Sequence, residues 1–507
     1  MKLLNIIVKA MSILWRFVVC TLIVLAYNCG SGGSGSDSSE AGSVSFRLVM
    51  QDSGTSRALV RQISDGEGVQ FECQSPDYVI DTIEAQVKDE NGEIIAEGGP
   101  FACEQGKGTI DEIEPGQNYI VFIFAKDPSG EILFTGKSDA VTVVAGAVAD
   151  AGLIALTSIN ERLVGDFIGA GFGFDDYDFY SWSVRSDAKF DGSGGGSFQD
   201  VAASDNILEG GTLTYGLRYD SSLSATLSNG TSFNGILNAD NTILAVADTD
   251  WEDDSIEMDV VLKKSTGLSN AILNGEYIGV RISSDPSTAL FTVTSHGDST
   301  GEFKFLAASN NNLSSGAFAY SVGSDGEATI VGIQTGAVSS EGIVSGDGSV
   351  VSLVDTDFRG GNEDIDLTVL VKTESGLSNS TLNGEYTAVS FGYDFFGEGY
   401  NAVTTVMSIT SDGVGNMVFK VLSDSNGDSG LFEATYSVGS NGRITINLPN
   451  DEVYEGIISG NGEVFTFVNT NLNDDFSARA RRPRSPAGSP SDRAGSRPRD
   501  PVDRSGA

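Results

Sequence analysis

The sequence predicts an all-β protein in which one β-sandwich is followed by three tandem eight-stranded antiparallel up-and-down barrels. The 507 residues include 63 Gly but only 11 Pro, and Ser, Thr, Asn and Asp are frequent. Such a composition is typical of short strands joined by tight turns. One segment also recurs: "TGLSNAILNGEYIGVRI" at 266–282, "SGLSNSTLNGEYTAVSF" at 375–391 and, more weakly, "ALTSINERLVGDFIGAGF" at 155–172. The recurrence predicts three copies of one domain.

Residues 1–28 have the pattern of an export signal. Basic residues end at Arg16, and an apolar run covers 17–26. That run is too short to span a bilayer of about 30 Å but suits the hydrophobic region of a signal peptide. Cys29 follows, at the start of a Gly/Ser-rich tether at 29–43. The segment resembles a bacterial lipoprotein signal, which implies acylation of Cys29. Simple secretion and an uncleaved anchor are the alternatives.

Residues 44–157 predict the β-sandwich. Strand-like runs alternate with turn sequences such as Asn91-Gly92, which favours hairpins. The stretch "GTIDEIEPGQNYIVFIFAKDPSGEILFTGKS" resembles small immunoglobulin-like or carboxypeptidase-regulatory-like sandwiches of surface proteins. Cys73 and Cys103 are the only cysteines after the signal region, and an even pair in an exported domain predicts a disulfide.

Residues 158–267, 268–376 and 377–482 predict the three barrels. The second copy contains eight consecutive strand-like runs with short connectors such as "GDST" and "SDG", which imply antiparallel neighbours. Its last run alternates apolar Leu367, Val369 and Val371 with polar Asp366 and Thr368. Pairing of the eighth strand with the first removes both exposed edges and closes a barrel.

Each copy opens on a Gly-x-aromatic element. The three elements are Gly165/Phe167, Gly275/Tyr277 and Gly384/Tyr386. They resemble the Gly-x-Trp start of lipocalin- and avidin-type barrels, and the whole repeat resembles tandem modules of uncharacterised bacterial surface lipoproteins. The resemblance implies a membrane-anchored envelope protein without a known activity.

Three further sets of equivalent positions, which we call columns, recur between the copies. The requirements of a common fold are enough to explain them. They are Tyr215, Tyr320 and Tyr436; Gly235, Gly342 and Gly456; and the triplets at 248–250, 355–357 and 469–471. The third copy keeps a strand-like pattern at Phe476, Ala478 and Ala480. The Arg/Pro/Ser-rich residues 483–507 predict a disordered tail, read either as a natural basic tail or as the product of a frame shift near 477.

The residues that usually carry catalysis are scarce. His296 is the only histidine, and one histidine without a nearby thiol cannot supply a zinc site. A net charge of −40 disfavours nucleic acid as a partner. We therefore predict no enzyme and no cofactor, with a carboxylate hydrolase as an alternative. The loop with Asp424, Asn426 and Asp428 leaves a surface calcium ion as a second alternative to a solvated turn.

Two loops are dense in aromatic residues, one in copy one and one in copy three. The aromatic residues that we expect to bind a partner are Phe179, Tyr180, Trp182, Tyr393, Phe395 and Tyr400. Aromatic rings beside carboxylates suit a glycan or an envelope protein. The sequence thus predicts a lipid-anchored protein of a bacterial cell envelope, at the outer membrane or cell surface, with a periplasm-facing position as an alternative. We expect a binding, adhesion or structural role. A carrier of small apolar ligands in the barrel lumens is the main alternative.

Overall fold

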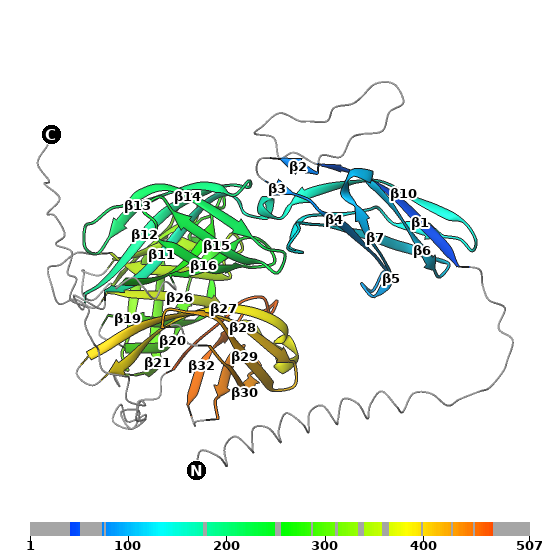
Figure 1. Cartoon of the computed structure of the whole chain (residues 1–507). Helices are drawn as coiled ribbons and strands as arrows, with labels where there is room; N and C mark the ends of the chain where they lie inside the picture. The colour runs from blue at the N-terminus through cyan, green and yellow to red at the C-terminus, as the bar shows by residue number, and fades with distance from the viewer. Residues whose placement is uncertain are drawn as a thin grey trace, which may run out of the picture.

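The computed structural model describes residues 41–50, 73–75, 78–175, 180–248, 255–284, 287–309, 313–332, 339–356, 365–396, 399–426, 429–449 and 452–469. These residues form an all-β protein (Figure 1), as predicted. Short 3-10 helices are interspersed, and none of the helices among the described residues is long and apolar enough to cross a membrane.

The N-terminal domain is one continuous sheet that folds around its own core. Its strand order is β5-β4-β7-β8-β10-β1-β6, with β9 paired to β7. Only the pairing of β1 with β10 is parallel among the strand pairs described. The immunoglobulin-like arrangement remains a prediction. The strands are β1 (Gly42–Met50), β2 (Gln74–Ser75), β3 (Tyr78–Val79), β4 (Thr82–Lys88), β5 (Ile94–Ala102), β6 (Lys107–Ile113), β7 (Gly116–Lys126), β8 (Ile132–Lys137), β9 (Val141–Val143) and β10 (Val148–Ser158).

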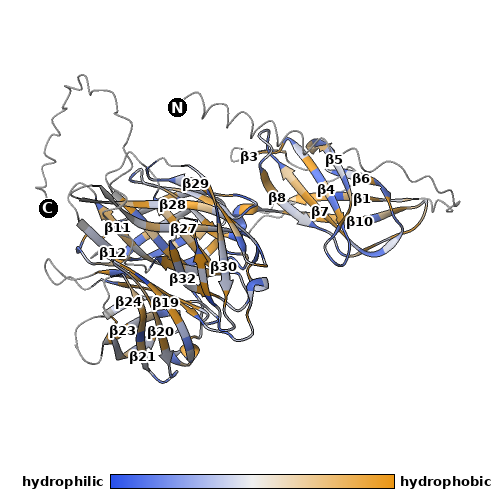
Figure 2. Ribbon diagram, turned by 90° about the horizontal axis from the view of Figure 1, so that it is seen from below, coloured by the Kyte–Doolittle hydropathy of each residue, from blue (hydrophilic) through white to orange (hydrophobic). Residues whose placement is uncertain are grey.

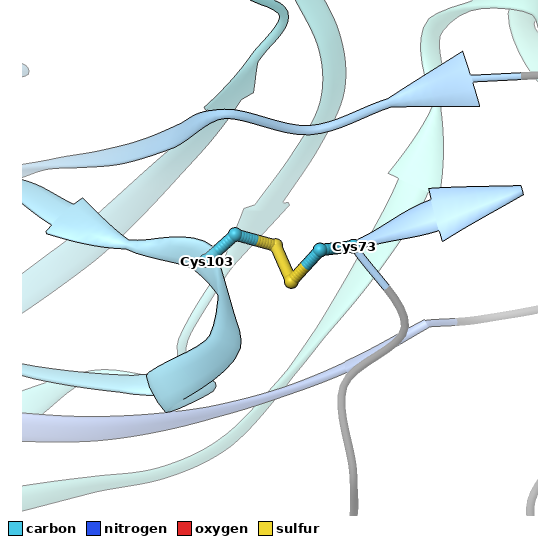
Figure 3. Close-up of a disulfide and its surroundings, with 2 residues drawn as sticks. All are labelled: Cys73 and Cys103. Carbon is cyan, nitrogen blue, oxygen red and sulfur yellow. A yellow bond between two sulfur atoms is a disulfide. The ribbon is translucent and has the colours of Figure 1, made fainter.

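A disulfide joins Cys73 to Cys103, as the sequence predicts. Cys73 lies just before β2, and Cys103 begins the 3-10 helix η1 (Cys103–Gln105) after β5 (Figure 3). Their Cα atoms are 5.8 Å apart, within the normal range for a disulfide. The bond ties the short β2–β3 hairpin to the main sheet, and both cysteines are part of the buried core.

Barrels 1 and 2 are closed antiparallel barrels of eight strands each. Barrel 1 follows η2 (Ile159–Arg162), and barrel 2 follows η3 (Asn270–Leu273). The strands of barrel 1 are β11 (Val164–Asp175), β12 (Tyr180–Asp191), β13 (Gly195–Ala203), β14 (Gly210–Leu217), β15 (Ser222–Leu227), β16 (Ser232–Leu237), β17 (Ile243–Asp248) and β18 (Ser255–Lys263). Those of barrel 2 are β19 (Gly275–Ser283), β20 (Ser287–Ser295), β21 (Thr300–Ala308), β22 (Ser315–Val322), β23 (Glu327–Gly332), β24 (Ser339–Val344), β25 (Val350–Asp355) and β26 (Asp366–Lys372).

The third copy, which we call barrel 3, is a seven-stranded sheet within the described residues, and its strands run in the same meander order. Its closure by an eighth strand remains a prediction. It follows η4 (Asn379–Thr381), and its strands are β27 (Asn383–Phe396), β28 (Gly399–Asp412), β29 (Asn416–Asp424), β30 (Leu431–Val438), β31 (Arg443–Asn447), β32 (Val453–Ile458) and β33 (Phe465–Asn469). The eighth strand expected at Phe476, Ala478 and Ala480 and the tail at 483–507 lie outside the described residues, as do the signal, Cys29 and most of the tether.

Two of the recurring columns have the same structural role in every barrel. The hydroxyl groups of Tyr215 and Tyr436 donate to the carbonyl oxygens of Leu163 and Leu382 over 2.8 and 2.9 Å. Tyr320 donates to the carbonyl of Asn270. All three tyrosines are buried, so each fixes the preceding 3-10 helix over one end of its barrel, which we call the closed end. The opposite end is the mouth.

The glycine column allows a close approach of two strands. A Cβ atom at Gly342 would lie 1.9 Å from the carbonyl oxygen of Ser352, and one at Gly456 would lie 1.8 Å from that of Thr466. These distances are far below any real contact, so only glycine fits at this position, where the sixth strand pairs with the seventh.

The three barrels form a ring in which every mouth lies on the same side. The hydroxyl of Ser183 in barrel 1 donates to the carbonyl of Asp355 in barrel 2. Thr288 of barrel 2 donates in the same way to Asn469 of barrel 3. Thr404 of barrel 3 completes the ring by donating to Asp248 of barrel 1. The third recurring column therefore supplies one acceptor for each junction, and the interfaces are heterologous and closed.

Each junction joins a front wall to a back wall. The front wall is the outer face of the first two strands, β11/β12, β19/β20 or β27/β28. The back wall is the outer face of the sixth and seventh strands, β16/β17, β24/β25 or β32/β33. Phe172 of barrel 1 meets Phe391 of barrel 3 edge-on, with ring centroids 5.2 Å apart. Ile282, at the equivalent position of barrel 2, belongs to the same cluster. Hydrophobic stretches run along these strands in Figure 2. The walls are thus apolar outside as well as inside the barrel.

The N-terminal domain contacts barrel 1 at its closed end (Figure 1). Phe124 of β7 packs edge-on against Tyr219, in the loop between β14 and β15, at a centroid distance of 5.5 Å. Arg218 in the same loop pairs with Glu131 over 3.3 Å. Because this loop lies at the closed end, the mouths face away from the N-terminal domain.

Candidate binding face at the barrel mouths

The aromatic residues singled out in the sequence lie at the mouth hairpins of barrels 1 and 3. Tyr180 begins β12 opposite Asp175, and Tyr400 pairs with Phe395 where β27 meets β28. Tyr393 is two residues before Phe395 on β27. The backbone thus brings these residues to one face of the ring. Phe179 and the side chains of the other four lie outside the description.

Trp182 is the candidate residue whose side chain is described, and it points into the mouth of barrel 1. Its ring lies over Gly173, where a Cβ atom would approach ring carbons to 2.2 Å. Its indole N–H donates to the carboxylate of Glu257. Trp182 is therefore a lining residue of the mouth, as expected of a side chain that folds over its own barrel end.

A pair of carboxylates lies beneath Trp182. Glu257 and Asp259 alternate with Ile256 and Met258 on β18, and they oppose Gly173 and Gly171 on β11. Phe167 and Val261, at the same parity on these two strands, belong to the lumen core, so both carboxylates face the lumen. A Cβ atom at Gly171 would lie 2.1 Å from a carboxylate oxygen of Asp259. Gly171 thus leaves room for the two acids, and Gly173 leaves room for the ring of Trp182.

The electrostatics of this mouth favour bound protons. Burial, followed by the charge of Asp259, raises the pKa of Glu257 well above its usual value. Burial and the charge of Asp200 raise the pKa of Asp259 to about 7. The pKa of Asp200 is raised to about 6, mainly by burial, with contributions from Glu209 and Asp205. Asp259 and Asp200 therefore titrate near neutral pH instead of near pH 4.

The equivalent end of barrel 2 is built differently. Arg281 occupies the position of Gly171, and Asp366 that of Glu257. The guanidinium and the carboxylate are 3.6 Å apart. The guanidinium also lies 5.7 Å from the ring centroid of Phe305. Barrel 2 thus neutralises its lumen acid internally, whereas the acids of barrel 1 are faced by glycines and Trp182.

The sequence did not identify the two carboxylates of barrel 1 as a cluster. The alternation of Glu257 and Asp259 with apolar residues is visible in the sequence, but a polar stripe on an antiparallel strand usually faces solvent. Here the stripe faces the lumen, because the apolar stripe of β18 faces neighbouring barrels. The sequence feature that could have located these carboxylates is the nearly continuous apolar run of the first strands. Such a run indicates a strand that is buried on both faces.

The described residues contain no group of three or more His, Cys, Asp or Glu side chains arranged to hold a metal ion. In the loop considered for calcium, a carboxylate oxygen of Asp424 accepts the backbone N–H of Asn426 over 2.8 Å. The other oxygen accepts the hydroxyl of Thr405 over 2.6 Å. Asp428 lies outside the described residues. Asp424 thus serves the local turn, and a calcium ion there remains a hypothesis.

Apolar side chains are also exposed on mouth loops. Ile207 and Leu208 follow β13 and are 60% and 55% exposed, and Leu313, in the corresponding loop of barrel 2, is 62% exposed. The lumens below are filled by side chains that pack into one core per barrel. The mouth side therefore offers contact surface above packed interiors.

Comparison with known proteins adds little. No protein-family profile and no curated protein matches the chain. Among solved structures, the chain is similar to a double mutant of the vaccine antigen transferrin-binding protein B from Haemophilus parasuis, with a TM-score of 0.24 and 11% identity over 76% of this chain and 80% of that one. A single mutant of the same antigen gives 0.23 and 10% over 80% and 95%. Values this low assign neither a shared fold nor a shared activity.

Proposed function

We propose that the protein is exported to the envelope of a bacterium, is anchored there by a lipid on Cys29, and has a non-catalytic binding role at the mouth face of its barrel ring. The orientation of the domains carries this proposal. The N-terminal domain, which follows the tether, contacts the closed end of barrel 1 through Phe124 and Tyr219. The mouth hairpins are therefore the part of the ring that points away from the anchor.

Two further observations support the proposal. The Cys73–Cys103 disulfide suits an oxidising compartment outside the cytoplasm. The packed lumens favour recognition on the surface over carriage of an apolar ligand, because Tyr215, Tyr320 and Tyr436 occupy the barrel interiors. A glycan or an envelope protein remains the proposed partner, with contacts from Phe179, Tyr180, Trp182, Tyr393, Phe395 and Tyr400.

The anchor is tested by Cys29→Ser in the full chain. We expect the variant to leave the membrane fraction and to lose labelling by palmitate, whereas the wild type keeps both. Full membrane retention of the variant, together with an unlabelled wild type, would remove the anchor from the proposal and leave the binding role to be tested separately.

The binding role is tested with the variant Tyr393→Ala/Phe395→Ala/Tyr400→Ala on a glycan array and on immobilised envelope proteins. Truncation of central aromatic contacts costs about 2 kcal/mol or more, or roughly thirtyfold in affinity. Val144→Ala/Val148→Ala is the matched control, because these exposed side chains lie on the N-terminal domain. Equal binding by both variants, each shown to be folded, would move the binding surface away from the mouths.

A further inference from the structure

Among the residues that the structure describes, the junction between barrels 1 and 2 differs from the other two by a buried cation. Arg185, on the front wall of barrel 1, has a side chain that is only 15% exposed. Its guanidinium lies 3.3 Å from the carboxylate of Glu327, on β23 at the edge of the back wall of barrel 2. It lies 3.5 Å from the carboxylate of Glu341, on β24 in that wall. The register places Leu290 and Val406 at the equivalent positions of barrels 2 and 3, since each is followed by the same bulge.

The three back walls differ in the same way. The positions of Glu327 and Glu341 in barrel 2 correspond by register to Ser222 and Asn234 in barrel 1. In barrel 3 they correspond to Arg443 and Glu455, which pair with each other over 2.5 Å. One back wall is thus doubly acidic, one is uncharged at these positions, and one is neutralised within itself.

We propose that Arg185 sets the cyclic order of the ring, because it makes the front wall of barrel 1 fit the back wall of barrel 2 and no other. All three fronts and all three backs share one framework, so a reversed ring, with front 1 on back 3 and front 3 on back 2, is sterically conceivable. Contacts between two chains could join the same walls.

The reversed ring fails on charge at two junctions. Arg185 would face Arg443, which already has its own acidic partner. Glu327 and Glu341 would face Val406 and be left together without a cation. A buried charge that loses its partner is strongly destabilising, and repulsion in the wrong complex is an effective source of specificity. The observed order avoids both penalties, while Leu290 packs with Ile457 at the apolar junction between barrels 2 and 3.

The test separates an ordering role from a merely stabilising one. The variant Arg185→Leu/Glu327→Gln/Glu341→Gln removes the pattern without leaving an unpaired charge. A reporter disulfide between Ser183→Cys and Asp355→Cys spans the junction, since the Ser183 hydroxyl contacts the Asp355 carbonyl. The wild type and the neutral variant, each carrying the reporter disulfide, are refolded from urea as full chains over a range of protein concentrations. Reporter yield and mass by light scattering are then measured.

We expect the neutral variant to refold with at least a twofold lower reporter yield and with a concentration-dependent fraction of dimers, although its strands form. Arg185→Leu alone should lower Tm by several degrees at pH 7, because it leaves Glu327 and Glu341 together without a cation. Lys126→Met, which breaks the Lys126–Glu84 pair of the N-terminal domain, is the control and should leave reporter yield unchanged. A neutral variant with wild-type reporter yield and mass would overturn the proposal.

Discussion

Barrels 1 and 2 share a backbone framework, yet they treat charge inside the lumen in opposite ways. Barrel 2 places Arg281 against Asp366. Barrel 1 has Gly171 in place of the arginine and adds a second acid, Asp259, beside Glu257. The same strand position is therefore an internal ion pair in one copy and part of an uncompensated acidic cluster in the other. Framework positions fix the fold, whereas lumen positions near the mouth are free to diverge.

The largest loss of stability is expected from Arg281→Met in barrel 2, which removes the cation of the ion pair with Asp366. Asp366 would then remain largely buried without its cation, and we expect a loss of about 2–3 kcal/mol in the free energy of unfolding. Urea denaturation at pH 7 measures the loss. Arg281→Met/Asp366→Leu is the control and should recover most of the stability. A single variant as stable as the wild type would show that solvent already screens the pair.

The lumen acids of barrel 1 predict that the stability of the protein falls as pH rises. The pKa values of Asp200 and Asp259 are raised to about 6 and about 7 in the folded state, and the pKa of Glu257 is raised as well. The contribution of Asp200 and Asp259 to stability is therefore complete below about pH 4 and is lost as pH rises through about 6 to 7. We expect the wild type to lose at least about 1 kcal/mol between pH 5 and pH 8 relative to Glu257→Gln/Asp259→Asn. Thermal unfolding of both proteins across this range measures the difference, and parallel curves would contradict it.

Trp182→Phe should have a smaller effect that is confined to barrel 1. The ring contact over Gly173 is largely kept, but the indole N–H that favours ionised Glu257 is removed. We expect the pKa of Glu257 to rise further and the protein to lose about 1 kcal/mol at pH 8, with less loss at pH 5. Carboxyl titration by NMR measures the pKa shift. An unchanged titration would place the indole bond elsewhere.

The smallest change tests the shared framework. Tyr215→Phe and Tyr436→Phe each remove a hydroxyl that bonds the carbonyl before the first strand. Loss of this bond should cost about 1 kcal/mol in each variant, without the pH dependence of the lumen acids. Tyr215→Phe should cost more, because the Tyr215 hydroxyl also accepts the backbone N–H of Gly192 over 3.0 Å. Urea unfolding at pH 5 and pH 8 measures both costs. A cost for Tyr215→Phe no larger than that for Tyr436→Phe would mean that the bond from Gly192 adds nothing to stability.

Much of the fold follows from local patterns in the sequence. Short connectors and alternation predicted the eight strands of barrel 2, and the cysteine count predicted the disulfide. The ring did not follow, because an apolar residue such as Ile278 or Val280 reads the same whether it faces a lumen or a neighbouring barrel. The near-continuous apolar run in β19 was the available sign of burial on both faces.

The candidate site was predicted only in part. The aromatic-rich segments of the sequence pointed to Trp182 and the mouth hairpins, because turns between dense apolar runs are visible in the sequence. The carboxylates that Trp182 covers come from a strand more than 70 residues later, and nothing local distinguishes Glu257 from a solvated acid. The register of β11 with β18 brings them together, and register depends on closure of the whole barrel.

The closed cycle of junctions fixes how many copies the architecture can hold. Each junction applies one rotation from front wall to back wall, and three such steps return to the start. A fourth copy inserted by gene duplication would have no free wall to join. Loss of one copy would expose an apolar front and an apolar back at once, including Phe172 or Phe391. Copy number in this architecture is therefore set by rotational geometry, and changes in repeat number should be tolerated far less well than in open, linear repeat arrays.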